Sequence, residues 1–477
     1  MKELFDHKAK IVCTIGPASE DEAILRKLIL AGMDIARLNF SHGTHEEHLR
    51  KIERIRKISG EIGKPVAIMQ DLQGPKIRIG TFKNPPINLK SGDKFTITIR
   101  PVQGDQTIVS TTYQNLPFDV KPGDFILVND GLIKLKVLST TTEDVHCEVV
   151  NGGSLYDRRG INLPGVKISE PSLTDKDKDD LRFGLEHDID YVALSFVRDA
   201  ESVIELRQFM GDRAVPIVSK LEKPEALENL EAIIKESDAI MVARGDLGVE
   251  ISTEKVPSVQ KLIIEKCMDH SKPVITATQM LDSMMVNPRP TRAEATDVAN
   301  AIFDGSDAVM LSGESAFGKY PLESVQMMNA IIRESEKHRK YFRLHPDLEN
   351  ELSEHAFSYS ICHAAARAAQ EIKARYIVVL TRSGYTARTM SHFRPDVPIL
   401  ALTSNPKTFR RMNLYWGAIP LYVGKDLFIS GELDDLQNLL LKGGWIENGD
   451  RLIIISGSSR RQGGTNLLRL HEVKIRG

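Results

Sequence analysis

The 477-residue sequence is poor in cysteine and in long hydrophobic segments, and neither sign of charge dominates it. Its four cysteines, Cys13, Cys147, Cys267 and Cys362, lie far apart, which argues against a disulfide framework or a zinc site and fits a reducing cytosol. Since no run of about 18 apolar residues occurs, no membrane span is expected. The polar start MKELFDHKAK lacks the pattern of a signal peptide, so we expect a cytoplasmic protein.

The net charge is only −2, with 63 Lys and Arg against 65 Asp and Glu. This balance gives no bulk attraction to nucleic acid or to a membrane surface, and we expect neither as a partner. A hydrophobic share of 41% and a charged share of 27% are ordinary for a globular protein. The length favours about three domains, and any anion chemistry must be local.

Short apolar segments alternate with amphipathic segments of helical period through most of the first 340 residues. The alternation predicts eight parallel strands, each followed by a helix, at residues 10–16, 34–40, 66–72, 191–196, 216–222, 239–248, 273–280 and 307–313. Nearly every polar cluster lies at the C-terminal end of one of these strands, where a barrel enzyme keeps its active site. The pattern therefore favours a closed (β/α)₈ TIM barrel over an open doubly wound sheet.

The alternation is interrupted once and then resumes. From about residue 80 to residue 170 the strands have period two and are separated by Gly and Pro turns, which predicts an inserted all-β domain. A polar segment at 339–355 predicts a linker, and a helix at 356–373 begins a second α/β domain with strands within 375–390 and at 398–404, 418–423 and 451–457. We expect the barrel at residues 1–74 and 170–340, the inserted domain at 75–169 and the C-terminal α/β domain at 341–477.

Polar side chains gather at the predicted strand ends. In chain order they are Arg37, Asn39, Ser41, His42, Asp71, Lys76, Arg78, Lys220, Glu222, Arg244, Gly245, Asp246, Thr276, Thr278, Gln279, Ser312 and Glu314. Glu222 and Asp246 offer hard oxygen ligands, which suit a Mg²⁺ ion that keeps its waters and binds substrate phosphates. Arg37, Arg78 and Lys220 suit the oxygens of a phosphoryl group in transfer, where positioning and charge neutralisation supply most of the catalysis. Isolated salt bridges at the barrel rim are the alternative, and convergence from several strands argues against it.

Two motifs resemble known sites without meeting their requirements. GESAFGKY at 313–320 matches GxxxxGK, but Tyr320 and Pro321 follow where a Walker loop needs Ser or Thr and a continuing helix. HGTHEEH at 42–48 is not HExxH, and we expect His45 and His48 on a solvated helix face, with only His42 in the strand-end cluster.

Two loops of the C-terminal domain predict a second phosphate site far from the barrel. LTRSGYTAR at 380–388 leads from a strand into a helix, whose N-terminal N–H groups are a ready anion site. SGSSRRQGGTN at 456–466 adds two arginines and several glycines. The alternative is that both are solvated surface loops.

The sequence resembles the pyruvate kinase family along almost its whole length. The stretches that carry the resemblance are KIVCTIGPAS, ARLNFSHG, VNDGLI, INLPG, ALSFVR, KLEKPEALENL, ARGDLGVE, ATQMLDSM and PTRAEATDVANAIFDGSDAVMLSGESAFGKYP. The resemblance implies a barrel with a β-rich lid after its third strand and a C-terminal effector domain. It also implies phosphoryl transfer from phosphoenolpyruvate to ADP and a homotetramer. The additional phosphohistidine-like domain of some bacterial members is not expected.

The resemblance also implies roles for single residues. The catalytic groups would be Arg37, Lys220, Thr278 and the lid residue Asp130. The substrate-binding groups would be Arg37, Lys220, Gly245, Asp246 and Thr278. Mg²⁺, or Mn²⁺ in its place, would be held by Glu222 and Asp246. The nucleotide contacts would be Pro17, Asn39, His42, Arg78 and Arg159. Lys220 would stabilise enolate charge, and Thr278 would work with a water to protonate the enolate.

The stretch QDLQGPKIRIG at 70–80 places the chain with the subgroup that resembles K⁺-independent members. Members that need K⁺ have Glu in place of Lys76, and their ion pocket matches Asn39, Ser41, Asp71 and the carbonyl of Leu72. We hypothesise that the ammonium of Lys76 takes the charge role of the ion, so that K⁺ is not required. The alternative is a solvated lysine at the hinge of the lid.

The two C-terminal loops resemble the family's phosphate-effector site. Its residues would be Thr381, Arg382, Ser383, Gly384, Thr386, Arg460, Arg461 and Gly463, and a sugar monophosphate or AMP is the expected effector. Two rival functions remain: another Mg²⁺-dependent barrel enzyme of phosphoenolpyruvate or pyruvate chemistry, of the aldolase or mutase type, and a metabolite sensor without activity. A reaction that depends on ADP would distinguish a pyruvate kinase from the aldolase- or mutase-type enzyme. The metabolite sensor is disfavoured because the charged residues at the strand ends are all present.

Overall fold

The computed structural model describes residues 2–338, 342, 356–424, 433–457 and 464–475. Eight parallel strands close into a barrel in the order β1-β16-β15-β14-β13-β12-β3-β2, which confirms the predicted (β/α)₈ architecture. These strands are β1 (Lys10–Thr14), β2 (Met33–Asn39), β3 (Ala67–Asp71), β12 (Tyr191–Leu194), β13 (Ile217–Leu221), β14 (Ala239–Ala243), β15 (Val274–Ala277) and β16 (Ala308–Leu311). They are buried along almost their entire length, because helices cover the outside and side chains fill the inside.

Helices surround the barrel, and five of them begin at a side-chain cap. The helices are α1 (Glu22–Ala31), α2 (His45–Ile62), α4 (Asp175–Glu186), α5 (Ala200–Met210), α6 (Pro224–Glu228), α7 (Leu230–Glu236), α8 (Arg244–Ile251), α9 (Val256–Asp269), α10 (Arg292–Asp304), α11 (Gly313–Ala316) and α12 (Pro321–Glu336). Thr44, Thr174 and Thr291 each form a capping box with the acidic residue three positions later. These boxes satisfy N–H groups that a helix start leaves open, so the start sites follow from local sequence.

The inserted domain, called the lid here, is all-β apart from the short helix α3 (Leu116–Asp119). Its strands are β4 (Ile87–Leu89), β5 (Lys94–Thr98), β6 (Ile108–Ser110), β7 (Phe125–Val128), β8 (Ile133–Thr140), β9 (Asp144–Asn151), β10 (Gly153–Leu155) and β11 (Ile161–Asn162). Six of them form one sheet in the order β11-β7-β8-β9-β5-β6. A separate hydrophobic core joins residues between Ile77 and Ile168, while the domain boundaries set out above stay a prediction.

The segment 124–140 contains two of these strands. It folds back into the hairpin β7–β8. Asn129, Asp130 and Gly131 all have positive φ, at 57°, 53° and 84°, and such left-handed backbone turns the chain between the two strands. Asp130 therefore projects from the tip of a hairpin.

The C-terminal domain contains a five-stranded sheet in the order β19-β18-β17-β20-β21. Its described elements are α13 (Ala356–Glu371), β17 (Tyr376–Leu380), α14 (Tyr385–His392), β18 (Ile399–Thr403), α15 (Pro406–Arg411), β19 (Ala418–Tyr422), α17 (Leu433–Lys442), β20 (Arg451–Gly457) and β21 (Thr465–Glu472). The sequence pattern did not predict the antiparallel edge strand β21, because only Thr465 of its residues is buried and no period of two marks it. The predicted linker lies outside the described residues except for Phe342.

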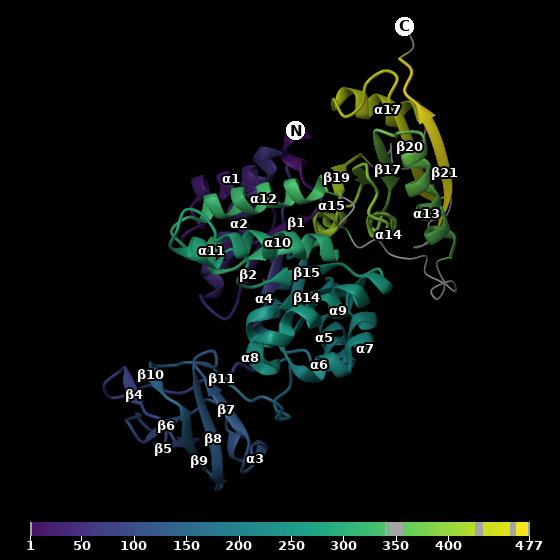
Figure 1. The fold of residues 1–477 in the computed structure, drawn as a ribbon. Coiled ribbons are helices and arrows are strands. Elements are labelled where there is room, and N and C mark those ends of the chain that lie inside the picture. Colours follow the sequence, from purple (N-terminus) through teal and green to yellow (C-terminus); the bar gives the residue numbers. More distant parts are fainter. Residues whose placement is uncertain (1, 339–341, 343–355, 425–432, 458–463, 476–477) are drawn as a thin grey trace.

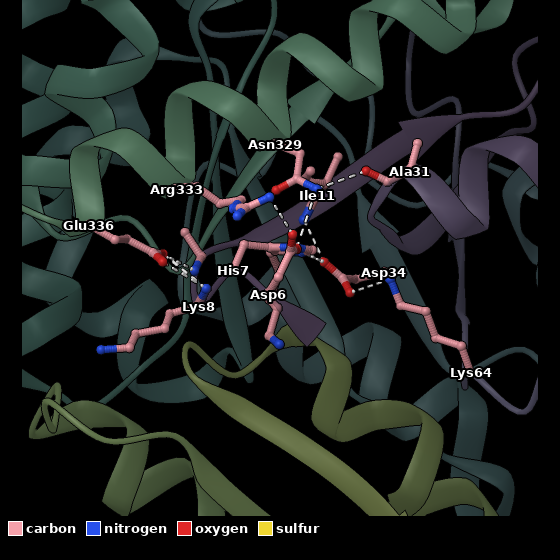
Figure 2. Close-up of polar contacts among 12 residues, drawn as sticks. Asp6, His7, Lys8, Ile11, Ala31, Asp34, Lys64, Asn329, Arg333 and Glu336 are labelled. Carbon is pink, nitrogen blue, oxygen red and sulfur yellow. Dashed lines mark hydrogen bonds and ion pairs between the residues drawn. The ribbon is translucent and has the colours of Figure 1, made fainter. Parts of the chain in front are cut away.

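The lid and the C-terminal domain lie on opposite sides of the barrel (Figure 1). At the end facing the C-terminal domain, Leu414 joins the hydrophobic cluster inside the barrel, and the Tyr191 hydroxyl donates to the carbonyl of Arg411 at 2.6 Å. The polar network of Figure 2 lies at the same end, around the N-terminus of β1. In the described part of the chain, no helix is long and apolar enough to cross a membrane.

Candidate active site

The C-terminal ends of neighbouring barrel strands join five polar side chains into one network. Arg37, near the end of β2, donates from Nε to Oδ2 of Asp71 at 2.5 Å. Lys220, on β13, places Nζ 3.2 Å from Oδ1 of Asp71 and 3.0 Å from Oε1 of Glu222. Lys220 also donates to the hydroxyl of Ser195 at 2.7 Å, and Glu222 accepts from the N–H of Phe196 at 2.8 Å. The alternation of side chains along β13 puts Lys220 and Glu222 on one face.

The electrostatics of this network are uneven. Burial disfavours the charged form of Asp71. The positive charges of Arg37 and Lys220 outweigh this effect, so the pKa of Asp71 is lowered. The pKa of Lys220 is raised by Asp71 and Glu222 despite its burial. Burial raises the pKa of Glu222, and the negative charge of Asp246 raises it further. The positive charge of Lys220 lowers it, but not enough to cancel the rise. A buried carboxyl group whose charge is disfavoured by a neighbouring carboxylate is an environment that a cation would stabilise.

Asp246 lies on α8, where the chain turns immediately after β14. The N–H of Gly245 donates to Oγ1 of Thr278 at 2.7 Å, and that hydroxyl donates to the carbonyl of Ala277 at 2.6 Å. Thr278 has a φ of 70°, a left-handed conformation that threonine rarely adopts. The hydroxyl of Thr278 thus holds the start of α8 in place in this conformation, and Arg244 supports the same loop by donating to the carbonyl of Thr278 at 2.7 Å.

A cleft between barrel and lid contains about 540 Å³ of space continuous with solvent. The residues that line it are Pro75, Lys76, Ile77, Asp130, Gly160, Ile161, Asn162, Ile168, Phe196, Arg198, Lys223 and Asp246. Of the predicted site residues, this cleft brings together Asp246 from the barrel, Asp130 from the lid and Lys76 from the crossing between them. Glu222 lies behind the cleft wall and is 1% exposed.

Comparison with known proteins identifies the family of this arrangement. A family model described as "Pyruvate kinase, barrel domain" matches residues 6–325, and one described as "Pyruvate kinase, alpha/beta domain" matches residues 359–471. The chain is 46% identical to a pyruvate kinase of Staphylococcus saprophyticus over 472 residues, which is 98% of this chain and 80% of the relative. Pyruvate kinases of Staphylococcus haemolyticus and Staphylococcus aureus are 45% and 44% identical, with the same coverage of both chains. The chain belongs to the pyruvate kinase family. It is an enzyme of that family.

The residues predicted as nucleotide contacts in this pyruvate kinase fold come from three places. Pro17 is exposed in the loop after β1, Asn39 is the last residue of β2, and His42 follows that strand. Arg78 and Arg159 are lid residues: the Arg78 guanidinium donates to the carbonyl of Arg158 at 3.1 Å, and Arg159 lies over the ring of Tyr156. Burial and the charges of Arg78, Lys76 and Arg37 lower the pKa of His42. Their nucleotide roles stay predictions.

The residues of the predicted monovalent-cation pocket are already engaged with protein donors. Oδ1 of Asn39 accepts from the N–H of Ser41 at 3.1 Å, and the carbonyl of Leu72 accepts from the Ser195 hydroxyl at 2.7 Å. Arg37 and Lys220 pair with Asp71, as described above. Lys76 is exposed at the cleft, and its ammonium forms no ion pair with any described residue.

Two expectations for individual residues were wrong. His48 is not on a solvated helix face: it is 3% exposed, stacks on the ring of Phe40 at 3.8 Å and contacts the carbonyl of His42 through Nε2. Burial lowers the pKa of His48 to about 4, so the ring is neutral and part of the core. Thr276 does not join the strand-end cluster, because it is fully buried and its hydroxyl contacts that of Ser306 at 2.8 Å.

Sequence reasoning missed Ser195, although it follows β12 in the stretch ALSFVR. Its hydroxyl contacts Lys220 and the carbonyl of Leu72, so it connects the ends of β3, β12 and β13. The available signal was its position, because no polar candidate had been assigned at the end of this strand. Thr14 was missed for the same reason, and its hydroxyl accepts from Nη1 of Arg37 at 2.8 Å.

The described part of the predicted effector site is the turn before α14. The N–H of Gly384 donates to the Thr381 hydroxyl at 3.0 Å, and Gly384 has a φ of 86°. The carbonyl of Arg382 accepts from the Thr408 hydroxyl at 2.7 Å, whereas the Thr386 hydroxyl is buried against that of Thr465 at 2.6 Å. The remaining predicted members, Arg460, Arg461 and Gly463, lie outside the described residues.

Proposed function

We propose that this enzyme transfers the phosphoryl group of phosphoenolpyruvate to ADP, giving pyruvate and ATP. The observation that carries the proposal is the position of Lys220 between Asp71 and Glu222, beside a cleft whose walls come from both barrel and lid. In the reaction, the bond between phosphorus and the enol oxygen breaks, and a bond forms to a terminal oxygen of ADP. The enolate then takes one proton at its methylene carbon and becomes pyruvate.

The side chains divide this work between charge and position. Lys220 and Arg37 are oriented by Asp71, so their positive charge can meet the transferring phosphoryl group without reorganisation. The ammonium of Lys220 also stabilises negative charge on the enolate oxygen. The N–H groups at the start of α8 seat the substrate carboxylate, and the Thr278 hydroxyl orients that loop. Thr278, with a water, delivers the proton to the enolate, and Asp130 closes over the site from the lid.

Glu222 and Asp246 suit a Mg²⁺ ion. Both are oxygen donors, and the raised pKa of Glu222 is caused partly by Asp246, so a cation held by both would relieve an unfavourable interaction. In the described part of the chain, no group of three or more His, Cys, Asp or Glu residues is arranged for a metal. Two carboxylates are enough for Mg²⁺, because it keeps waters and substrate oxygens in its coordination shell. The ion would supply charge neutralisation between substrate carboxylate and phosphate, and Mn²⁺ could replace it.

The first experiment is pyruvate formation from phosphoenolpyruvate and ADP with Mg²⁺ in a tetramethylammonium buffer, with and without K⁺. We expect activity in both conditions. A reaction that proceeds without ADP would instead favour an aldolase- or mutase-type enzyme. A folded protein with no activity in either buffer, even with effectors present, would contradict the proposal.

The K⁺ independence is assigned to Lys76, whose ammonium takes the charge role of the ion. Its exposed position at the cleft and its effect on the pKa of His42 support a location among the phosphate-binding cations. Lys76→Glu is expected to reduce activity in tetramethylammonium and to create an activation by K⁺. Lys121→Glu, an exposed lid residue away from the cleft, is the matched control. An active Lys76→Glu variant that ignores K⁺ would refute the assignment.

Regulation is proposed at the turn 381–386, where a phosphorylated metabolite, a sugar monophosphate or AMP, would bind together with the loop 456–466. The test is the half-saturation concentration of phosphoenolpyruvate with each metabolite added in turn. We expect at least one metabolite to lower the half-saturation concentration. If no metabolite changes it, the proposal of an effector site is wrong. The homotetramer is tested by sedimentation, with a mass four times 53.3 kDa as the expected result.

A further inference from the structure

Three side chains outside the reacting groups connect the lid to the barrel: Asn162, Lys223 and Glu250. Asn162 ends β11 at the edge of the lid sheet, and its Nδ2 donates to Oε1 of Glu250 at 3.0 Å. Lys223 directly follows Glu222, and its Nζ donates to the same oxygen at 2.6 Å. Figure 1 shows β11 beside α8, the helix that carries Glu250.

Burial makes this contact different from an ordinary surface hydrogen bond. The side chains of Glu250 and Lys223 are 1% and 6% exposed, while Asn162 and Lys223 reach the wall of the cleft. A buried carboxylate needs both a counter-charge and hydrogen-bond donors. The other oxygen of Glu250 has no hydrogen-bond partner among the described residues, so the carboxylate depends on these two donors. One of the two is supplied by the lid.

Two of the three residues also lie close to the proposed Mg²⁺ ligands along the chain. Glu250 is one helical turn after Asp246 on α8, and Lys223 is adjacent to Glu222. The lid is covalently attached only through its two crossings to the barrel. Arg198 holds the returning crossing by donating to the carbonyls of Ile168 and Glu170. Asn162 adds a point of attachment across the cleft, which restricts rotation of the lid about the crossings.

We propose that Asn162, Lys223 and Glu250 form a latch that sets the orientation of the lid over the cleft. These are positioning residues, since they act by placing the lid residues Arg78, Asp130 and Arg159 over the site. The consequence for nucleotide binding rests on the proposed function, whereas the effect on lid orientation does not.

The orientation of the lid can be measured directly on the full chain without any ligand. All four native cysteines are buried, so spin labels at Lys136→Cys on the lid and Glu201→Cys on the barrel report one distance. Asn162→Ala is expected to broaden or shift this distance distribution. The control Asn151→Ala, an exposed asparagine of the same lid, is expected to leave it unchanged. An unchanged distribution in Asn162→Ala would overturn the latch, whatever the activity of the enzyme.

Kinetics then distinguish positioning from a general structural role. Asn162→Ala is expected to raise the half-saturation concentration for ADP roughly tenfold, the size expected for losing one hydrogen bond to a charged group. The half-saturation concentration for phosphoenolpyruvate is expected to change less than about twofold, because the residues predicted to bind this substrate lie on the barrel. Parallel changes for both substrates would contradict the latch.

Glu250→Gln tests the same contact from the barrel side, because the amide oxygen can still accept from Asn162. Its effect on lid orientation is expected to be smaller than that of Asn162→Ala. The change in label distance in the double variant is expected to differ from the sum of the changes in the two single variants, because both substitutions act on one contact. Additive changes in the label distance would contradict a shared contact. If Glu250→Gln does not fold, the Asn162 variants alone still decide the proposal.

Discussion

At the N-terminal end of the barrel, Asp34 is surrounded by donors, whereas at the C-terminal end Glu222 shares its surroundings with a second carboxylate. Asp34 receives Nε2 of His7 at 2.8 Å, Nζ of Lys64 at 3.2 Å and the N–H of Ile11 at 3.0 Å (Figure 2). Burial would raise the pKa of Asp34, but Lys64 and His7 lower it well below its usual value. The pKa of Glu222 moves in the opposite direction.

The two ends also differ in what lies beside the charges. The cleft wall beside the Glu222 network includes Asp246, Lys76 and Asp130, which remain available to a ligand. The Asp34 network is enclosed by the N-terminal segment, where Glu336 accepts from the N–H groups of Lys8 and Ala9. Buried Lys10 extends it to the C-terminal domain by donating to the carbonyl of Ala418 at 2.8 Å. A buried carboxylate surrounded by positive charges indicates a role in architecture, and one left beside a like charge at a cleft indicates a ligand site.

The largest expected effect is on activity, at the C-terminal end. Lys220→Met keeps the length of the side chain but removes the charge that faces the transferring phosphoryl group. We expect kcat to fall at least about 10²–10³-fold, as when other preorganised electrostatic groups are removed. Stability should change little, because Glu222, with its pKa already raised, can take up a proton. A steady-state assay and a thermal unfolding curve check both parts. A large loss of stability would show that the two ends do not differ as described.

The next effect is on stability, at the N-terminal end. Asp34→Ala leaves the buried Lys64 and His7 without their counter-charge. The expected loss is about 3–5 kcal/mol in the free energy of unfolding, the usual result of breaking a buried ion pair from one side. Denaturant unfolding measures it, and kcat per folded molecule should stay close to that of the natural chain. A marginal loss of stability would contradict the architectural role.

The smallest effect concerns pH. Both ring nitrogens of His7 face carboxylate oxygens, of Asp34 and Asp6, so both can donate only when the ring is protonated. Burial and the charge of Lys64 oppose protonation, but Asp34 and Asp6 outweigh them and raise the pKa of His7. Glu336, Lys10 and Arg333 complete the charged surroundings. The protonated ring therefore stabilises the folded state fully below the unfolded value of about 6.5, and this contribution is lost as pH rises through the raised folded pKa.

His7→Gln removes this dependence. The stability difference between the natural chain and His7→Gln should shrink as pH rises above about 6.5, by about 1.4 kcal/mol for each tenfold difference in proton affinity between the folded and unfolded states. Denaturant midpoints of both proteins across pH 5.5–9 measure it. Parallel curves would show that His7 is neutral in the folded state.

Much of the fold follows from local patterns. The alternation of apolar and amphipathic segments marks eight strand–helix units, and such units close into a barrel. Caps such as Thr44 and Thr291 mark where some of the helices begin. The strand-end candidates Lys220 and Glu222 could be predicted because alternation and strand direction decide where a side chain points. The edge strand β21 could not, because only its first residue is buried.

The sequence by itself determined the barrel, the family and the set of charged residues at the strand ends, because these depend on periodicity and on short contiguous motifs. Only the tertiary structure decided which charges meet. Asp34 and Glu222 are both acidic residues in or beside a barrel strand, and their neighbours alone separate a structural charge from a candidate metal ligand. Asn162 and Glu250 are 88 residues apart and meet only because the lid folds back over α8. Contacts of this range depend on how whole domains pack, and no local pattern encodes them.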